Sequence, residues 1–110
     1  MIKKQTIKQK IMYNKLFNSL DKALENSIRT YIKEHVLNFF NIYKEDGTRI
    51  NEMLFMNFVE EVFLAAYGHS NEPAWIQEGT IKENKKTIDI IAYVLKDEIQ
   101  KNNLSEVLNF

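Results

Sequence analysis

Apolar and aromatic residues recur at helical spacing through the first half of the chain. They follow one another at steps of three or four residues, in the order Tyr13, Phe17, Leu20, Leu24, Ile28, Tyr31, His35, Phe39 and Ile42. The steps repeat every eleven residues, or about 3.67 residues per turn, which keeps one face of a nearly straight helix in register. The pattern predicts one long helix near residues 18–43, with Glu25 and Arg29 paired on its outer face.

A second helix is predicted between a turn at Gly47 and a stop at Gly68. Asp46 before Gly47 favours a tight turn with a positive φ, and Asn51 is suited to cap the helix that follows. Glu52 then stands in the first turn, where the helix dipole favours a negative charge. The expected buried face of this helix comprises Leu54, Phe55, Phe58, Val59, Val62, Ala65 and Ala66.

A third helix is predicted from the capping-box spacing of Thr80 and Glu83. Residues 87–95 are rich in β-branched side chains, but the cap and a coherent polar face favour a helix over a strand. After residue 101 the sequence predicts a frayed end or one extra turn. The expected buried face comprises Ile81, Ile88, Ile91, Ala92, Leu95 and Ile99.

These elements predict an all-α fold. Residues 1–12 add a short basic helix or arm, which gives a bundle of about four helices in a single domain over residues 1–110. Between residues 68 and 80, Pro73 suits the first turn of a short helical link, and His69 is placed to tie the loop to Glu72. Trp75 anchors this link, either as a lid on the core or as an exposed contact residue.

Composition narrows the class of protein. Hydrophobic residues make up 45% and charged residues 27%, an ordinary globular balance. Cysteine is absent, so disulfides and thiolate metal sites are excluded. Neither a membrane span nor a signal peptide is recognisable, so we expect a cytoplasmic protein without membrane association. The many Lys, Asn and Ile codons are typical of an AT-rich genome, such as that of a low-GC bacterium or one of its mobile elements.

The net charge of zero hides an uneven distribution. Residues 1–33 carry a charge of +6, residues 34–80 carry −6, and no lysine or arginine stands between Arg49 and Lys82. One interpretation is that the two regions neutralise each other within the fold, and the other is that each attracts its own partner. Thirteen lysines and only two arginines follow from codon supply as much as from chemistry.

Catalytic chemistry finds little support in the sequence. His35 and His69 are the only histidines, and they stand on different predicted elements, so a three- or four-ligand metal site is not expected. No glycine-rich phosphate loop is present, because three glycines are spread over the chain. His35 is interpreted as a core or interface residue within the apolar stripe. We expect a protein that is not an enzyme and that needs no cofactor or metal.

Surplus apolar side chains on the second predicted helix indicate a protein-binding surface. Methionine and aromatic residues rimmed by carboxylates form an adaptable contact surface, although burial of this helix on both sides is the competing interpretation. The candidate residues are Met53, Met56, Glu60, Phe63, Tyr67, Glu72 and Trp75. They predict a small helical regulator or inhibitor that docks on a protein partner, for which a basic nucleic-acid-handling enzyme is one candidate. The sequence does not separate this function from that of an immunity-type protein or antitoxin.

Lysine-rich segments support an alternative function, that of a DNA- or RNA-binding accessory protein. Lysines that contact phosphates need no base-specific pattern, and a helix N-terminus adds to their attraction for anions. The candidates are Lys3, Lys4, Lys8, Lys10, Lys15, Lys82, Lys85 and Lys86.

Self-association as a homodimer is also predicted. A helix of about 25 residues would extend roughly 37 Å, longer than a compact domain of this size needs. Its last turns stay apolar, with Phe39, Phe40, Ile42 and Tyr43. A second copy of the chain would cover them, with His35 near the interface.

Overall fold

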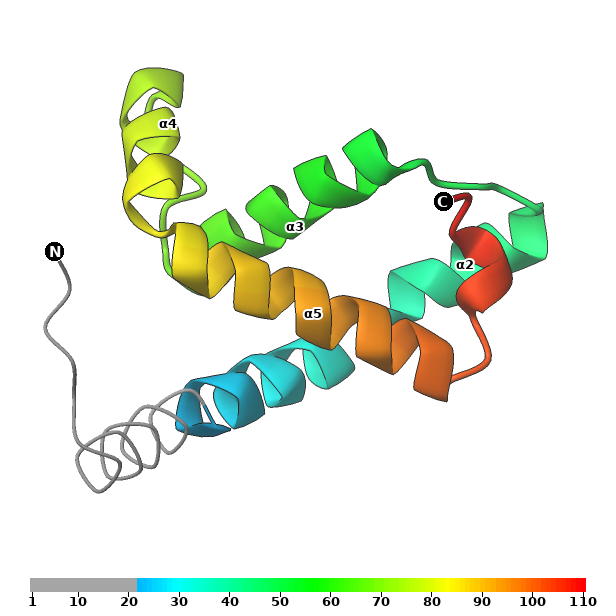
Figure 1. Cartoon of the computed structure of the whole chain (residues 1–110). Coiled ribbons are helices and arrows are strands. Elements are labelled where there is room, and N and C mark those ends of the chain that lie inside the picture. The colour runs from blue at the N-terminus through cyan, green and yellow to red at the C-terminus, as the bar shows by residue number, and fades with distance from the viewer. Residues whose placement is uncertain (1–21) are drawn as a thin grey trace, which may run out of the picture.

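The computed structural model describes residues 22–110, and all regular elements within this range are helical. These residues form five α-helices and a short 3-10 helix, whose arrangement is shown in Figure 1. The only β-type pairing among the described residues is an isolated bridge between Ile50 and Leu108. The all-α prediction is confirmed, with one α-helix more than the four expected. The elements are a helix over residues 22–35, α2 (Leu37–Asp46), α3 (Glu52–Ala66), α4 (Ala74–Glu83), α5 (Lys85–Lys101) and η1 (Ser105–Val107).

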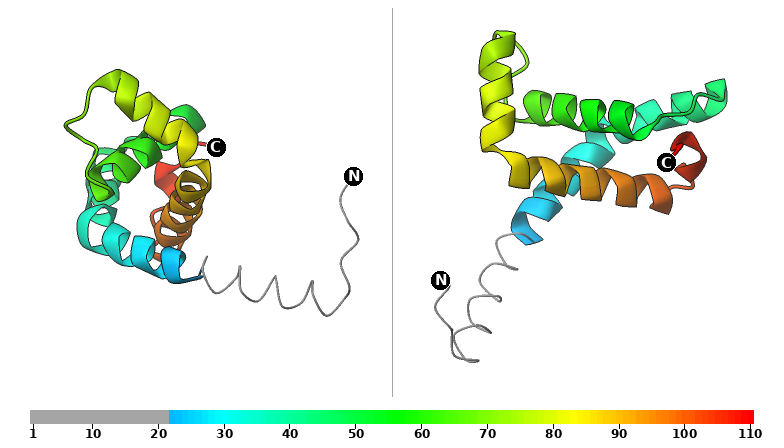
Figure 2. Two further views of the ribbon diagram at one scale, coloured as in Figure 1. Left: turned by 90° about the vertical axis from the view of Figure 1, so that its left-hand side faces the viewer. Right: turned by 45° about the horizontal axis from the view of Figure 1, so that its top comes forward.

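The predicted long helix near residues 18–43 is divided at Val36. Val36 has φ −119° and ψ −43°. Its carbonyl accepts a hydrogen bond from Phe39 N at 3.1 Å, three residues ahead, as in a 3-10 helix. The chain therefore changes direction between the 22–35 helix and α2, as Figure 2 shows. The segment preceding residue 22, including the predicted arm over residues 1–12, lies outside the described residues.

The buried row of these two helices also differs from the predicted stripe. It consists of Ile28, Ile32, Val36 and Phe40, at uniform steps of four residues. The predicted positions His35, Phe39 and Ile42 are exposed, because a row that advances by four residues at each step leaves the predicted stripe after Ile28. The interpretation of His35 as a core residue is therefore wrong; its ring lies 4.7 Å from that of Tyr31.

The ends of α2 and α3 follow the predicted signals. Gly47 adopts φ 71° after α2, and Gly68 adopts φ 79° after α3. Asn51 caps α3 by accepting a hydrogen bond from Leu54 N at 2.8 Å. After α3, the His69 amide donates back to Leu64 O at 2.8 Å, the long bond of a Schellman motif.

The buried face of α3 is rotated from the predicted one. Phe55, Val59 and Val62 are buried as expected, but Phe63 and Leu64 are buried as well. The remaining predicted positions do not reach the core as expected: Phe58 is half-buried, and Leu54, Ala65 and Ala66 are exposed. The buried face of α3 is therefore centred closer to Phe63 than predicted, and this face packs on α5.

The capping box predicted at Thr80 does not start a helix. Thr80 lies inside α4, where its hydroxyl donates to Ile76 O at 3.0 Å, and α5 begins only at Lys85. Within α5 the prediction of a helix over residues 87–95 is confirmed. Of its predicted core positions, Ile88, Ile91, Leu95 and Ile99 are buried and Ala92 is half-buried, whereas Ile81 lies in α4 and is half-buried.

The core lies where α5 meets α3 on one side and the 22–46 segment on the other. α3 and α5 run beside each other, and α4 joins them at one end and projects from the pair (Figures 1 and 2). At the opposite end, η1 packs on α2. The largest fully buried side chains are Phe40, Phe63, Ile32, Ile91, Leu95, Ile99, Leu104, Val59, Val94 and Val107.

The C-terminal segment forms one extra turn, η1, the second of the two predicted alternatives, and it is held in place. Leu104 and Val107 are fully buried. The Ile50 amide donates to Val107 O at 2.7 Å, and the Asn109 amide donates to Ile50 O at 2.8 Å. These bonds satisfy both the amide and the carbonyl of Ile50, in the loop between α2 and α3.

A charged cluster joins the 22–35 helix to α5. Arg29 bonds Glu25 at 3.0 Å, as its spacing predicts, but also donates to Asp97 and Glu98, each at 2.7 Å. The Glu98 side chain is only 3% exposed. Arg29 therefore faces the helix packing instead of the predicted outer face, and the three carboxylates raise the pKa of its guanidinium, Glu98 most strongly.

Candidate functional site

A hollow of about 340 Å³ lies in the angle between α3 and α4. Each helix contributes four lining residues spaced i, i+3, i+4 and i+7, and residues with this spacing lie on one face of a helix. We name this hollow the α3–α4 corner. It is lined by Asn57, Glu60, Glu61 and Leu64 from α3 and by Ala74, Gln77, Glu78 and Ile81 from α4.

The α3–α4 corner is acidic. Glu60, Glu61 and Glu78 form no ion pair with any cation in residues 22–110. The cause lies in the sequence, since neither wall carries a lysine or arginine before Lys82. Three carboxylates on a concave surface create a negative potential that attracts cationic groups.

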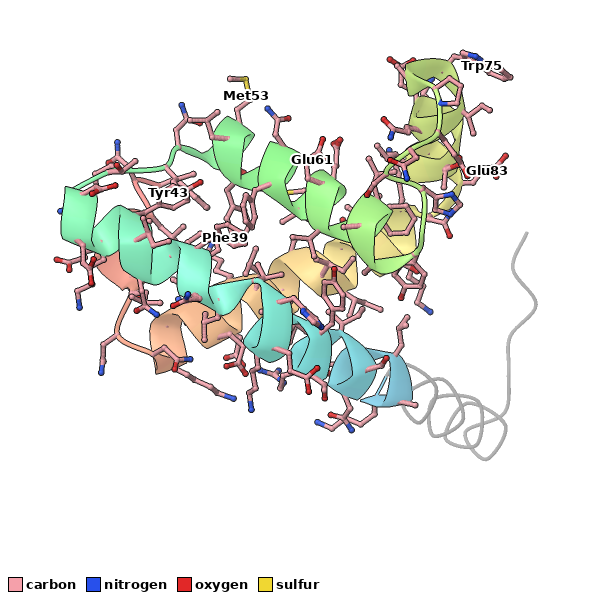
Figure 3. All side chains as sticks on the ribbon, turned by 180° about the vertical axis from the view of Figure 1, so that it is seen from behind. Phe39, Tyr43, Met53, Glu61, Trp75 and Glu83 are labelled. Atoms are coloured by element: carbon pink, nitrogen blue, oxygen red, sulfur yellow. The ribbon has the colours of Figure 1, made fainter. Side chains whose placement is uncertain are left out.

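Exposed apolar side chains flank these carboxylates. Met53 stands one helical turn before Asn57 and extends the α3 wall, and it is largely exposed. Trp75 follows Ala74 in the first turn of α4 and is 75% exposed, so the interpretation of Trp75 as a core lid is wrong. In Figure 3, Met53, Glu61 and Trp75 project from the outer side of α3 and from the far end of α4.

The loop before α4 fixes the direction of this helix. His69 Nδ1 lies 2.8 Å from Glu72 Oε1, which confirms the predicted tie within the loop. The Gln77 side-chain amide donates to His69 O at 2.9 Å and to Ser70 O at 3.3 Å. The ring of His69 also stacks on Phe63, at 6.2 Å between centroids. These contacts connect α4 to the end of α3, although α4 itself has no buried residue.

Only part of the predicted protein-binding set gathers at the α3–α4 corner. Glu60 lines the corner, and Met53 stands on the same face of α3 one turn before Asn57, whereas Trp75 lies on α4 outside the lining and Glu72 is engaged by His69 in the loop. Phe63 is 2% exposed, so it belongs to the core and not to a contact surface. Two others lie elsewhere: Met56 packs against the core, and Tyr67 borders a small hollow facing the 22–35 helix.

Sequence reasoning missed Glu61, Gln77 and Glu78. The signal was present, because Asn57, Glu60, Glu61 and Leu64 have the spacing of a single helix face. The absence of basic residues between positions 49 and 82 marked the same region. The missing information was the direction of α4, which depends on loop contacts that no periodicity encodes.

The lysines of the alternative site divide into two groups. Lys82, Lys85 and Lys86 are exposed around the junction of α4 and α5. The other five, Lys3, Lys4, Lys8, Lys10 and Lys15, lie outside the described residues.

Two further findings concern residues 22–110 as a whole. No three side chains of histidine, aspartate or glutamate in this range are grouped so that they could hold a metal ion. No helix in the same range combines the length and the apolar character that crossing a bilayer requires.

Comparison with known proteins gave no relative. The sequence matches no protein-family model, and neither the curated proteins nor the solved structures contain a significant match.

Proposed function

We propose that this chain is a non-enzymatic interaction protein, a small helical regulator or inhibitor that binds a basic protein partner through the α3–α4 corner. A nucleic-acid-handling enzyme is a suitable partner, because such enzymes present lysine- and arginine-rich surfaces. The observation that carries the proposal is the group of unpaired carboxylates, Glu60, Glu61 and Glu78, in one hollow whose α4 helix also carries the exposed ring of Trp75.

Charge and apolar area have separate parts in this interaction. The carboxylates steer a cationic partner toward the corner and fix its orientation, which acts mainly on the association rate. Trp75 supplies the large apolar area that dominates many interfaces, since tryptophan is enriched among the residues whose loss weakens binding most. Met53 adds a side chain that adapts its shape to the partner.

Affinity purification with the tagged full-length chain, with and without nuclease, tests this function. Proteins captured by the unmodified chain in the presence of nuclease are compared with those captured by Trp75→Ala and by Glu60→Gln/Glu78→Gln. We expect Trp75→Ala to weaken binding of the partner about 30-fold, as at other tryptophan hot spots, and the double charge variant to weaken it about tenfold.

Two matched controls lie away from the corner. Tyr93→Ala removes an exposed aromatic ring from α5, and Glu45→Gln removes an exposed carboxylate from α2. Both controls should capture the same proteins as the unmodified chain. Capture that is equal for all variants, or that disappears with nuclease, would contradict the proposed function.

The alternative function, binding of DNA or RNA, is favoured by one observation: Lys82, Lys85 and Lys86 are exposed within two adjoining helix ends. A protein that contacts phosphates through lysine loses affinity steeply as salt rises. Binding of the chain to a nonspecific duplex at low salt, reduced by Lys82→Gln/Lys85→Gln and by Lys3→Gln/Lys4→Gln, would support this function. No measurable binding at low salt would exclude it.

A further inference from the structure

A second open surface lies between α2 and α3. Two hollows of about 270 and 320 Å³ follow each other along these helices and share Phe58 and Glu61 as lining residues. α2 packs on α5 and η1 more closely than on α3. It touches α3 at Phe58, whose ring lies 6.4 Å from that of Phe39 and 5.2 Å from that of Phe40, and the two hollows adjoin this contact. We name this surface the α2–α3 groove. Its apolar lining comprises Val36, Phe39, Tyr43, Ile50, Leu54, Phe58, Val62 and Ala65.

Large apolar side chains in the α2–α3 groove face solvent. Phe39 is 52% exposed and Leu54 is 49% exposed, although both belong to helices that pack a core with their other faces. Figure 3 shows Phe39 and Tyr43 on the side of α2 that faces α3, and Glu61 of α3 lines both hollows. Exposed leucine and phenylalanine gathered along one groove mark a surface suited to burial by another protein.

Charges of both signs stand in the same groove. Arg49, from the loop before α3, and Glu61, from α3, line one of the two hollows. Arg49 donates only to the neighbouring Thr48 O, at 3.3 Å, and neither Arg49 nor Glu61 forms an ion pair within residues 22–110. An occupant that satisfies both must carry an anion and a cation at the matching separation.

We propose that the occupant is a second copy of this chain, related by a two-fold axis. In such an interface residue i of one protomer meets residue j of the other, and j meets i. Arg49 of each protomer then pairs with Glu61 of its partner, and Leu54 lies near the axis. A purely basic partner would satisfy Glu61 but would leave Arg49 facing a like charge, so the groove fits a copy of itself better.

The dimer is separable from the function proposed for the α3–α4 corner. Glu61 stands on the ridge between groove and corner, but the binding test above uses Glu60, Glu78 and Trp75 and leaves Glu61 unchanged. A dimer without a basic partner, or a basic partner bound by a monomer, would each be recognised.

Mass by light scattering of the full chain over a range of micromolar concentrations is the first measurement. We expect about twice the chain mass of 13.1 kDa. Arg49→Glu alone and Glu61→Arg alone each place like charges at both symmetric contacts. Each single variant should therefore raise the dimer dissociation constant by about 100-fold or more, at roughly tenfold per contact.

Mixing the two single variants gives the decisive result. In a mixed pair every new charge faces an opposite charge, so Arg49→Glu and Glu61→Arg should form a heterodimer although neither forms a homodimer. The double variant Arg49→Glu/Glu61→Arg should recover the homodimer. Glu45→Arg, outside the groove on α2, serves as the control for a general charge effect and should keep the dimer.

Circular dichroism establishes that each variant keeps its helices. A monomer mass for the unmodified chain throughout the micromolar range would overturn the proposal. A dimer that survives both single substitutions would overturn it as well, because it would be held together by another surface. The same conclusion would follow if the folded single variants failed to associate when mixed.

Discussion

Arg29 is the counter-ion of a carboxylate that lies almost entirely inside the helix packing. Glu98 is 3% exposed, and its oxygens are satisfied by Arg29 at 2.7 Å and by the Asn102 side chain at 3.3 Å. Removing one member of a buried pair leaves the other charge desolvated without compensation, whereas replacing both by apolar groups is often nearly neutral. Loss of either Arg29 or Glu98 alone should therefore destabilise the fold more than loss of both.

Variants of the pair test this dependence. Arg29→Met should lower the free energy of unfolding by about 3 kcal/mol, because Glu98 loses its cation. Arg29→Met/Glu98→Met should recover most of that loss, because the buried charge disappears as well. Urea denaturation followed by circular dichroism measures both. If the double variant were less stable than the single one, the argument from desolvation would be wrong.

Asp97 gives the same cluster a dependence on pH. Lys101, at 3.0 Å, and then Arg29 hold the pKa of Asp97 below its usual value. The unfolded chain therefore takes up the proton first as pH falls, so this stabilisation is present above about pH 4 and is lost as pH falls through the folded-state pKa. Asp97→Asn should flatten the acid part of the stability profile, and Asp89→Asn, which removes an exposed carboxylate of α5, should not.

At the scale of elements, the segment after α5 completes the core. Leu104 and Val107 are fully buried although they stand in a nine-residue stretch without a regular α-helix. Leu104→Ala should lower the free energy of unfolding by about 3 kcal/mol, the usual cost of a buried leucine. Ser105→Ala, at an exposed neighbouring position, should change it by less than about 0.5 kcal/mol. Equal effects in thermal or urea unfolding would mean that the segment is not part of the core.

Elements with one strong apolar face were predictable, and those that depend on tertiary contact were not. α5 follows from its periodicity, and the ends of α2 and α3 follow from Gly47, Asn51 and Gly68. The division at Val36 was missed because neither glycine nor proline marks it. The capping box predicted at Thr80 failed because a threonine hydroxyl can also donate to a carbonyl one turn earlier within a helix, as Thr80 does to Ile76 O.

The candidate site was predictable in its chemistry but not in its shape. The lysine-free stretch indicated an acidic surface, and Met53, Glu60 and Trp75 were identified from residue type. Which carboxylates share one hollow depends on the angle between α3 and α4. That angle is determined by the hydrogen bonds of His69 and Gln77, which join residues of a loop.

At the scale of the whole molecule, α4 is the least firmly attached α-helix of the described range. It has no buried residue, and the contacts of Gln77 with the preceding loop are its main polar attachment. Local opening requires less free energy where few apolar contacts are lost. Amides of residues 77–82 should therefore exchange with deuterium at least about tenfold faster than those of residues 91–99. Equal protection of the two segments would show that α4 unfolds only with the entire molecule.

The bridge between Ile50 and Leu108 joins positions separated by more than half of the sequence. Closing so long a loop costs entropy before any contact compensates for it, so this junction forms after the transition state of folding. Leu104→Ala should accordingly accelerate unfolding and leave the refolding rate nearly unchanged in stopped-flow measurements. The segment that fastens the loop between α2 and α3 thus determines how long the native state persists, and has little influence on how quickly it forms.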